Sequence, residues 1–387
     1  MRTCIVTGEY YKRHETMVNY HIEHLFGGDT CVLYSKDVGA SPLDRASLNR
    51  RISDRSLLGN LSHLAQSAAM SLRHSTVRVP SRDERKWIKR FFAEQKVEAG
   101  LSEFGTQTVA VAPVFAEAGV PLFGYFRGFD ASRIIQVRRK ARAYQKMMSN
   151  LAGIVGVSQF LLDNLASKGI VHPNAHVIPS GVDVRRFIPG QKIPNRFLTV
   201  GRFVEKKLPK LTLRAFAEAT ANHPDAVLEM IGDGPLLEPC KSLAAELGIA
   251  DRVIFHGAQP HSFVQERLAV SQFFLQHSVT APDGNTEGLP IAIQEAMASG
   301  AVVLSTRHAG IPEAVEEGHT GLLVDEHDAK GFAQGIVRLL SEELDIAAMT
   351  ALARKRAVEK FDNQVLIKRL ETVMLETVRS RQAVGPT

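Results

Sequence analysis

The segment EGLPIAIQE contains two glutamates, Glu287 and Glu295, that stand eight positions apart around the predicted start of a helix. Pro290 suits a first helical turn, because its missing N–H would be unpaired there in any case. The residues up to Ala298 are good helix formers, and Gly300 is a suitable C-terminal stop. We therefore expect Glu287 to lie just before the helix and Glu295 to lie inside it.

The start of this predicted helix can bind an anion. Backbone N–H groups at Gly288 and Leu289 and the positive end of the helix dipole would face the ligand. Two carboxylates would repel a bare anion but can bind sugar hydroxyls, so the arrangement fits a sugar linked to a phosphate. For the bare pair, one alternative is a capping acid followed by a surface acid. Hydrolysis of a glycosidic bond is another, although both carboxylates must then flank that bond.

Basic residues follow another predicted strand. Arg202 stands at the end of the strand Phe197–Val200, and Lys207 precedes the next predicted helix. Open α/β sheets place their ligands at the carboxyl ends of strands, and a guanidinium and an ammonium can together hold one phosphate. Gly234 lies in a further strand-end turn, IGDGP. Alternatively, Arg202 and Lys207 are ordinary charges of a surface loop, and Gly234 serves only the geometry of its turn.

These motifs carry a resemblance to a known family. The run DGNTEGLPIAIQEAMASGAVVLSTRHAGIPE resembles the E-x7-E signature and the T-x-x-G-G-x-P-E block of retaining GT-B glycosyltransferases of family 4 (group 1), among them bacterial exopolysaccharide, colanic-acid and O-antigen enzymes. VGRFVEKKL resembles their G-R-x-x-x-K-K-G block. The resemblance covers about Leu198 to Asp328 and only patches of the first half. Leu208 and Ala309 stand where the family has glycine, so Lys207 could be displaced.

The resemblance implies an α/β GT-B fold, with two Rossmann-like domains that face each other across a cleft. It implies an acceptor-binding domain over 1–189, completed by a C-terminal helix over about 364–387 that crosses back, and a nucleotide-sugar-binding domain over 190–363. The alternation of apolar β-branched runs with helical patterns also indicates parallel sheets. One such run, Thr108–Ala112, is predicted to be a strand.

The implied reaction is the transfer of a hexose, with retained configuration, from a UDP- or GDP-linked sugar to a sugar acceptor, such as a lipid-linked oligosaccharide in cell-surface polysaccharide biosynthesis. Arg202 and Lys207 would stabilise the departing diphosphate. Glu287 would bind the transferred sugar, Glu295 the ribose, and Gly234 would line the donor site. Because protein charges would stabilise the leaving group, we expect no metal and no cofactor. A GT-B sugar-nucleotide epimerase and a non-enzymatic lipid-surface protein are the alternatives.

The segment FRGFD, which contains Arg127, resembles the family's F-H-G-x-D, in which the histidine reaches the donor sugar. Arg127 replaces that histidine, and arginine stays charged and cannot accept a hydrogen bond. Two interpretations follow: Arg127 contacts a negatively charged donor or acceptor, or it belongs to the basic face that follows it.

Basic residues gather in two stretches of the chain, whose formal net charge is +6. Residues 127–146 hold seven Lys and Arg against Asp130, and residues 45–96, expected to be mostly helical, hold twelve against four acids. Such helices suit the anionic surface of a cytoplasmic membrane leaflet. The alternative is that these residues form a solvated basic face on helices whose apolar side packs on the core. No nucleic-acid recognition motif is present, so we expect no nucleic-acid partner.

The three cysteines, Cys4, Cys31 and Cys240, are scattered and show no metal-binding spacing, which is typical of a reduced compartment. No secretory signal is visible at the N-terminus. The longest weakly charged stretch, Thr106–Phe126, is interrupted by Pro113 and Pro121 and does not read as a membrane span. We expect a cytoplasmic protein, with peripheral attachment to the inner membrane face if its basic helices bind lipid.

Overall fold

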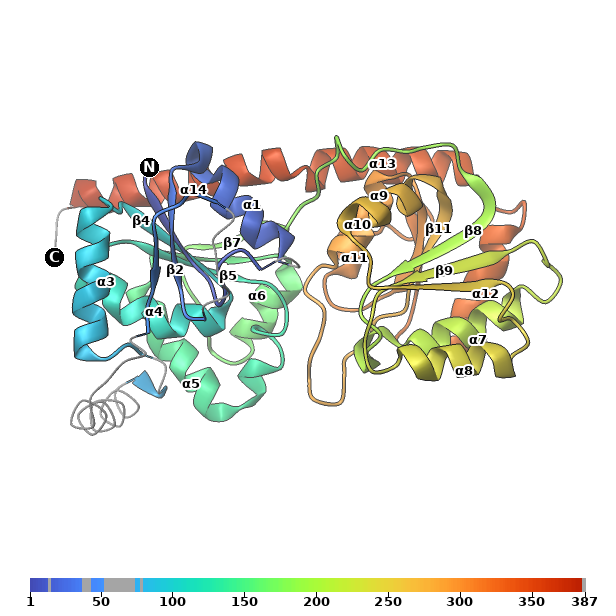
Figure 1. Ribbon diagram of the computed structural model, residues 1–387, viewed down its shortest axis with the longest axis horizontal. Helices are drawn as coiled ribbons and strands as arrows, with labels where there is room; N and C mark the ends of the chain where they lie inside the picture. Colours follow the sequence, from blue (N-terminus) through green and yellow to red (C-terminus); the bar gives the residue numbers. More distant parts are fainter. Residues whose placement is uncertain (13–14, 37–42, 52–73, 77–78, 385–387) are drawn as a thin grey trace. The chain divides into compact units, whose positions relative to one another are not determined.

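The computed structural model describes residues 1–12, 15–36, 43–51, 74–76 and 79–384 of the chain. The chain divides into two compact units, Met1–Ile178 with Ile367–Thr387, and Pro179–Leu366 (Figure 1). Each unit contains one parallel sheet with helices packed on it, which is the expected α/β architecture.

Within the described residues, the sheet of the first unit has seven parallel strands in the order β3-β2-β1-β4-β5-β6-β7. The order reverses between β1 and β4. Strand β1 pairs with β2 on one side and with β4 on the other, so Cys4 lies opposite both Cys31 and Gly100. Its strands are buried on both faces, as expected for parallel sheets covered by helices. Their bounds are β1 Thr3–Val6, β2 Thr30–Tyr34, β3 Ser47–Asn49, β4 Ala99–Glu103, β5 Leu122–Phe126, β6 Gly153–Gly156 and β7 Ala175–Val177.

Helix α4 packs between α3 and α5 against this sheet (Figure 1). Helix α3 begins at a capping box, in which Ser81 and Glu84 bond to each other's backbone N–H groups. The helices described between β1 and β7 are α1 Thr16–His24, η1 Leu25–Gly28, α3 Arg82–Glu94, α4 Gly105–Glu117, η2 Ile134–Gln136, α5 Arg138–Met147, η3 Met148–Asn150 and α6 Gln159–Ala166.

The predicted strand at Thr108–Ala112 is wrong, because these residues lie inside helix α4. The helix is buried along most of its length, so it has no polar stripe at helical spacing, and its alternating Val and Ala residues resemble a buried strand. The strand of this region is β4, Ala99–Glu103, which contains no β-branched residue. The short strand β3 likewise lies in a stretch that was expected to be helical.

The sheet of the second unit has six parallel strands in the order β10-β9-β8-β11-β12-β13. The direction of the order reverses between β8 and β11, which is the place where doubly wound sheets bind ligands. The strand bounds are β8 Ile193–Val200, β9 Val227–Ile231, β10 Val253–Gly257, β11 Ser271–Gln276, β12 Val302–Thr306 and β13 Gly321–Val324.

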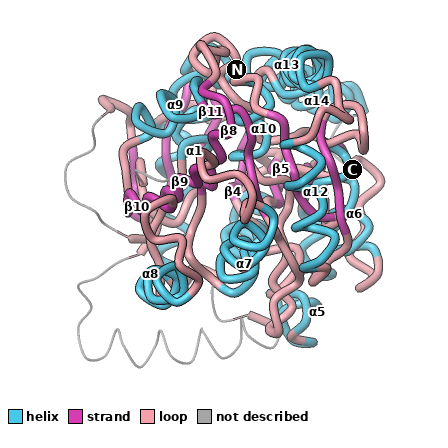
Figure 2. Tube along the Cα trace, turned by 90° about the vertical axis from the view of Figure 1, so that its right-hand side faces the viewer, coloured by secondary structure: helices cyan, strands magenta, loops and turns pink. Residues whose placement is uncertain are grey.

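Helices cover both faces of this second sheet. Helices α7, α8 and α12 lie on one face, and α9, α10 and α13 lie on the other (Figures 1 and 2). Phe197, Phe216 and Phe273 form the centre of the core beneath α7. The helix bounds are η4 Glu205–Lys207, α7 Pro209–Ala219, α8 Leu237–Glu246, α9 His261–Val270, α10 Ile291–Ala298, α11 Ile311–Ala314, α12 Ala329–Leu340 and α13 Ile346–Phe361.

The last helix, α14 Asn363–Val384, follows α13 almost directly, and its residues from Ile367 onward belong to the first unit. There, Glu371 accepts a hydrogen bond from the backbone of Phe26, and Asn174 donates one to Thr377. The C-terminal helix therefore returns to the first unit, as the fold class implied.

Among the described residues, no helix combines the length and the apolar character needed to cross a bilayer. The basic segment predicted over 45–96 lies partly outside the described residues, because it includes 52–73 and 77–78.

Candidate functional site

The predicted donor-binding residues of the second unit gather at the point where its strand order reverses. Arg202 and Lys207 follow β8, and Glu287 lies in the segment after β11, the neighbouring strand. Arg202, Lys207 and Gln276 line a small pocket at these strand ends. The structure thus brings together residues that lie up to 85 positions apart in the sequence, at the edge where such sheets bind ligands.

Two lysines hold the carboxylate of Glu287. The Nζ of Lys207 lies 3.0 Å from Oε1 of Glu287, and the Nζ of Lys206 lies 3.4 Å from Oε2. The three side chains are only 12–17% exposed. Lys206 also donates to the carbonyl oxygen of Thr286 at 3.4 Å, which ties the β8 turn to the segment before α10. A triad of two cations and one anion leaves a net positive charge that suits a phosphate group.

Burial and the neighbouring charges act in opposite directions on the pKa values of this triad. Burial would raise the pKa of Glu287, but the neighbouring charges of Lys207 and Lys206 outweigh it and lower this pKa to about 2. Burial lowers the pKa of Lys207, although the contact with Glu287 opposes the change. The carboxylate of Glu287 is therefore ionised at neutral pH, whereas the charged ammonium of Lys207 is less stable in its buried position than in water. Such a cation gains when a further anion arrives beside it.

A histidine fixes the backbone at Glu287. The N–H of Glu287 donates to Nε2 of His308 at 3.1 Å, so the proton of the neutral imidazole is on Nδ1. Nδ1 lies 2.6 Å from Oε1 of Glu326, whose other oxygen accepts the N–H of Thr280. Burial lowers the pKa of His308, which favours this neutral form. Ala309, next to His308, has a left-handed backbone with a φ of 49°.

Helix α10 begins one residue later than predicted, with Pro290 as its N-cap, and it ends before Gly300, which has a φ of 70°. Glu295 lies inside the helix and is buried, and its Oε1 is 2.8 Å from Nε2 of His261, the first residue of α9. The hydrogen bond with Glu295 raises the pKa of His261. The two predicted glutamates thus have separate partners: lysines hold Glu287, and a histidine holds Glu295.

The turns after β8 and β9 pack backbone against backbone. The N–H of Phe203 donates to the carbonyl oxygen of Asp233 at 3.0 Å. A Cβ atom at Gly234, whose φ is 150°, would lie 2.6 Å from the carbonyl oxygen of Phe203. Gly234 is therefore required by this close contact, which sets the position of the turn that carries Arg202.

Arg127, predicted as a donor contact or a surface residue, lies in the first unit and is held by a buried acid. Its Nε and Nη2 lie 2.8 and 2.6 Å from Oε2 of Glu103, and its guanidinium stacks 4.2 Å from the ring of Tyr125. Only 10% of the Arg127 side chain is exposed. His21 lies 2.6 Å from the other oxygen of Glu103. Although burial opposes it, the charges of Arg127 and His21 lower the pKa of Glu103.

A larger cavity opens in the first unit where its own strand order reverses. It has a volume of about 440 Å³ and follows the ends of β1, β2 and β4. Phe104 and Phe129, whose rings are 5.7 Å apart, form an aromatic wall. The polar lining includes two ion pairs, Lys36 with Glu9 and Lys12 with Glu15, and also Ser35, Arg51, Thr106 and Gln107. Rings beside paired charges are suited to a sugar, which has an apolar face and many hydroxyls.

Sequence reasoning missed Lys206, His308 and His261, each of which contacts a predicted residue. The pair of adjacent lysines after a strand was a sequence signal for Lys206. The sequence offered no such signal for either histidine, because each lies 21 or more positions from the glutamate that it contacts.

Residues 184–356 match the family model described as Glycosyl transferases group 1. This match contains Arg202, Lys207, Glu287 and Glu295. The match lies wholly within the second unit, Pro179–Leu366, and covers most of it, including the lysine–glutamate triad.

Curated relatives are similar over a longer stretch. "Putative colanic acid biosynthesis glycosyltransferase WcaL" of Escherichia coli (strain K12) is 29% identical over 72% of this chain and 70% of its own length. The amylovoran biosynthesis glycosyltransferase AmsK of Erwinia amylovora is 28% identical over 64% of this chain and 62% of its own. A GDP-mannose-dependent phosphatidylinositol monomannoside mannosyltransferase of Mycolicibacterium smegmatis is 26% identical over 82% of this chain and 87% of its own.

Solved structures match nearly the whole fold. HepE of Anabaena, crystallised in complex with UDP, superposes with a TM-score of 0.77 at 16% identity, covering 97% of this chain and 100% of HepE. The lipopolysaccharide outer core galactosyltransferase WaaB superposes with a TM-score of 0.71 at 18% identity, covering 97% of this chain and 99% of WaaB. These structures share the two-sheet GT-B architecture.

Proposed function

We propose that this chain, whose residues 184–356 match the family model of the glycosyl transferases group 1, is a glycosyltransferase that transfers a hexose, with retained configuration, from a UDP- or GDP-linked sugar. The triad of Lys206, Lys207 and Glu287 at the strand-order reversal carries this proposal. It supplies buried positive charge where doubly wound sheets bind nucleotides. The names of relatives and neighbours mention both GDP-mannose and UDP, so both donors are tested.

In the proposed mechanism, Arg202, Lys207 and the start of α10 near Gly288 and Leu289 receive the diphosphate. Charge grows on this group as the bond to the sugar breaks, and preorganised cations stabilise that charge without reorganisation. Lys207 is suited to this role because burial already disfavours its charge and a new anion relieves that cost. We propose that these protein charges act in place of a metal and that the enzyme needs no cofactor.

The two glutamates would bind hydroxyls. Glu287, held by two lysines and placed by His308, would accept hydrogen bonds from the transferred sugar. Glu295, oriented by His261, would accept them from the ribose. Gly234 would let the β9 turn approach the donor closely. Arg127 pairs with the buried carboxylate of Glu103, which supports a positioning role for Arg127 in the first unit.

The donor proposal is tested by thermal shift, since a ligand of the folded state raises the melting temperature by mass action. UDP, GDP and their hexose conjugates are compared with and without EDTA. We expect one nucleotide series to stabilise the protein equally in both buffers. Lys207→Ala and Glu287→Ala should lose most transfer activity while remaining folded. Near-normal turnover in either variant would remove the site assignment, and conversion of the donor without an acceptor would indicate an epimerase.

For the acceptor, we propose a sugar, carried on a lipid during cell-surface polysaccharide assembly, bound in the 440 Å³ cavity of the first unit. The aromatic wall of Phe104 and Phe129 would stack on one sugar face. Relatives named for colanic acid and amylovoran biosynthesis support this class of product. We further propose a cytoplasmic location with peripheral attachment to an anionic membrane surface through basic segments, chiefly 127–146. Phe129→Ala should weaken acceptor use without changing donor binding.

A further inference from the structure

Helix α5 presents an unusually basic surface. Its sequence, RRKARAYQKM, contains five Lys and Arg residues and no acid. All five are exposed, whereas Ala141, Ala143, Tyr144 and Met147 face the core. Arg138, Lys140 and Arg142 form no ion pair with any part of the chain that the structure describes. Such a surface favours an anionic partner.

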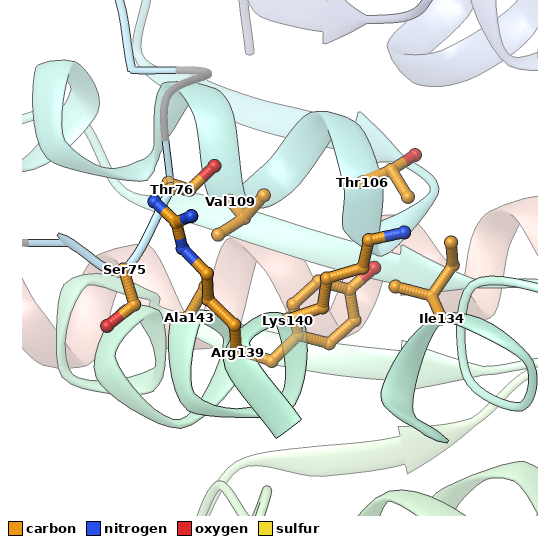
Figure 3. A pocket seen from close by; sticks show the side chains of 9 residues that line it. Ser75, Thr76, Thr106, Val109, Ile134, Arg139, Lys140 and Ala143 are labelled. Atoms are coloured by element: carbon orange, nitrogen blue, oxygen red, sulfur yellow. The ribbon is translucent and has the colours of Figure 1, made fainter. Parts of the chain in front are cut away.

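An apolar cavity lies beside these cations. It has a volume of about 200 Å³ and is lined by Val109 of α4, Ile134 of η2, and Ala143 and Tyr144 of α5. Arg139 and Lys140 stand at its rim. Figure 3 shows the guanidinium of Arg139 extending toward Thr76 and the ammonium of Lys140 extending toward Thr106.

The size and lining of this cavity restrict its ligand. It is smaller than the roughly 300–1,000 Å³ of pockets that hold whole cofactors or drug-sized molecules. Its floor offers buried apolar side chains, with Val109 6% exposed and Ala143 3% exposed. A short alkyl segment fits that floor, and a phosphate at the rim would meet Lys140. Val137, which directly precedes α5, is 48% exposed, and this also suits contact with acyl chains.

We propose that α5 and this cavity bind an anionic phospholipid of a membrane surface, with its phosphate at the basic rim and part of an acyl chain in the cavity. This inference rests on the membrane attachment proposed above and adds a specific lipid site to it. It does not depend on the donor site, which lies in the other compact unit. An acidic protein or a nucleic acid would satisfy the charge but would leave the apolar cavity unused.

Vesicle cosedimentation tests the charge. Wild-type protein should bind vesicles of equal parts phosphatidylcholine and phosphatidylglycerol, and not vesicles of phosphatidylcholine alone. Lys140→Gln with Arg142→Gln should weaken binding about twenty-five-fold, because each cation near an anionic surface changes binding about fivefold. Lys330→Gln with Arg338→Gln removes the same charge from exposed positions of α12 and should leave binding within about twofold of wild type. Equal effects of both pairs would overturn the site.

The cavity is tested by filling it without a change in charge. Ala143→Leu, or the smaller Ala143→Val if the first variant does not fold, should weaken binding of short-chain phosphatidylglycerol at least threefold by calorimetry. Glycerol phosphate, which lacks acyl chains, should bind far more weakly than the lipid. Unchanged lipid binding in the folded cavity variant, or equal binding of glycerol phosphate, would refute acyl insertion. In all variants the thermal shift with nucleotide should match wild type, so failure of this proposal leaves the donor proposal intact.

Discussion

The buried contact between Lys207 and Glu287 should behave as an energetically coupled pair. We consider Lys207→Met and Glu287→Gln, alone and combined, because Gln has the shape of Glu and Met is an unbranched side chain close in length to Lys, so each substitution removes the charge with little change in shape. Each single change leaves one buried charge with fewer partners. The double change removes both charges, so neither is left buried without its partner. The effects of the two single changes on the free energy of unfolding should therefore not add.

The magnitude follows from the pKa values. Lowering the pKa of Glu287 from 4.5 to about 2 corresponds to about 3 kcal/mol, since one pKa unit equals 1.36 kcal/mol. The pKa of Lys207 is also lowered, so its charge disfavours the folded state, and the net value of the pair is smaller. We expect Glu287→Gln to cost about 3 kcal/mol at neutral pH. Lys207→Met should cost less, about 1–2 kcal/mol, because Lys206 remains 3.4 Å from the carboxylate. The coupling should reach about 1–3 kcal/mol.

The pH dependence has a defined sign. Because the pKa of Glu287 is lower in the folded than in the unfolded protein, its contribution is fully present above pH 4.5 and is lost as the pH falls toward about 2. Acidification in this range should therefore destabilise wild type more than Glu287→Gln.

The assay must report on the second unit. The one tryptophan of the chain, Trp87, lies in the first unit, so its fluorescence does not follow unfolding of the second. Hydrogen exchange of the backbone amides of β8 and β9, measured under native conditions, gives the free energy of opening there. The exposed pair Lys241 and Glu238, with Nζ and Oε1 2.7 Å apart, serves as the matched control and should show coupling below about 0.5 kcal/mol. Additive effects of Lys207→Met and Glu287→Gln, within about 0.5 kcal/mol, would refute the reasoning.

Three further changes test other contacts. Leu208→Gly should be more stable than Leu208→Ala by about 1 kcal/mol, because residue 208 has a φ of 37° and both variants lose the same packing; equal denaturation midpoints would contradict this. Glu295 raises the pKa of His261, so the stability that wild type has over His261→Gln should be present below pH 6.5 and disappear as the pH rises through the folded-state pKa; a pH-independent difference in melting temperature would exclude it. Arg127→Met should destabilise the first unit by about 3 kcal/mol, because it leaves the buried carboxylate of Glu103 with His21 alone; tryptophan fluorescence during urea unfolding measures this, and a loss below about 1 kcal/mol would count against it.

The sequence predicted the residues that belong to strand-end motifs. Arg202 and Lys207 could be found because they follow a strand closely, and parallel strands bring their carboxyl ends to one edge. Glu287 could be found because Pro290 marks the start of the helix that follows it. The C-terminal stop at Gly300 could be found because a helix end needs a left-handed residue there.

The side-chain partners could not be predicted in the same way. Arg127 pairs with Glu103 because β4 and β5 are neighbours, and no sequence pattern in either segment predicts that pairing. The same is true of His308, which reaches Glu287 from the turn after β12. Helix α4 was missed for another reason, because burial on nearly every face removes the polar stripe by which a helix is recognised.

The two departures from the family glycines show that backbone shape at this site follows from the fold. Leu208 and Ala309 both keep a left-handed backbone, with φ values of 37° and 49°, although side chains rarely adopt it. Leu208 follows Lys207 and Ala309 follows His308, so both strained residues adjoin side chains that contact Glu287. With leucine at position 208, the Nζ of Lys207 lies 3.0 Å from that carboxylate. Strain of about 1–2 kcal/mol per residue persists only where surrounding contacts over-determine the turn. Here the hydrogen bonds from Lys206 to Thr286 and from Glu287 to His308 supply those contacts, so relieving the strain should change stability more than it changes the position of the lysines.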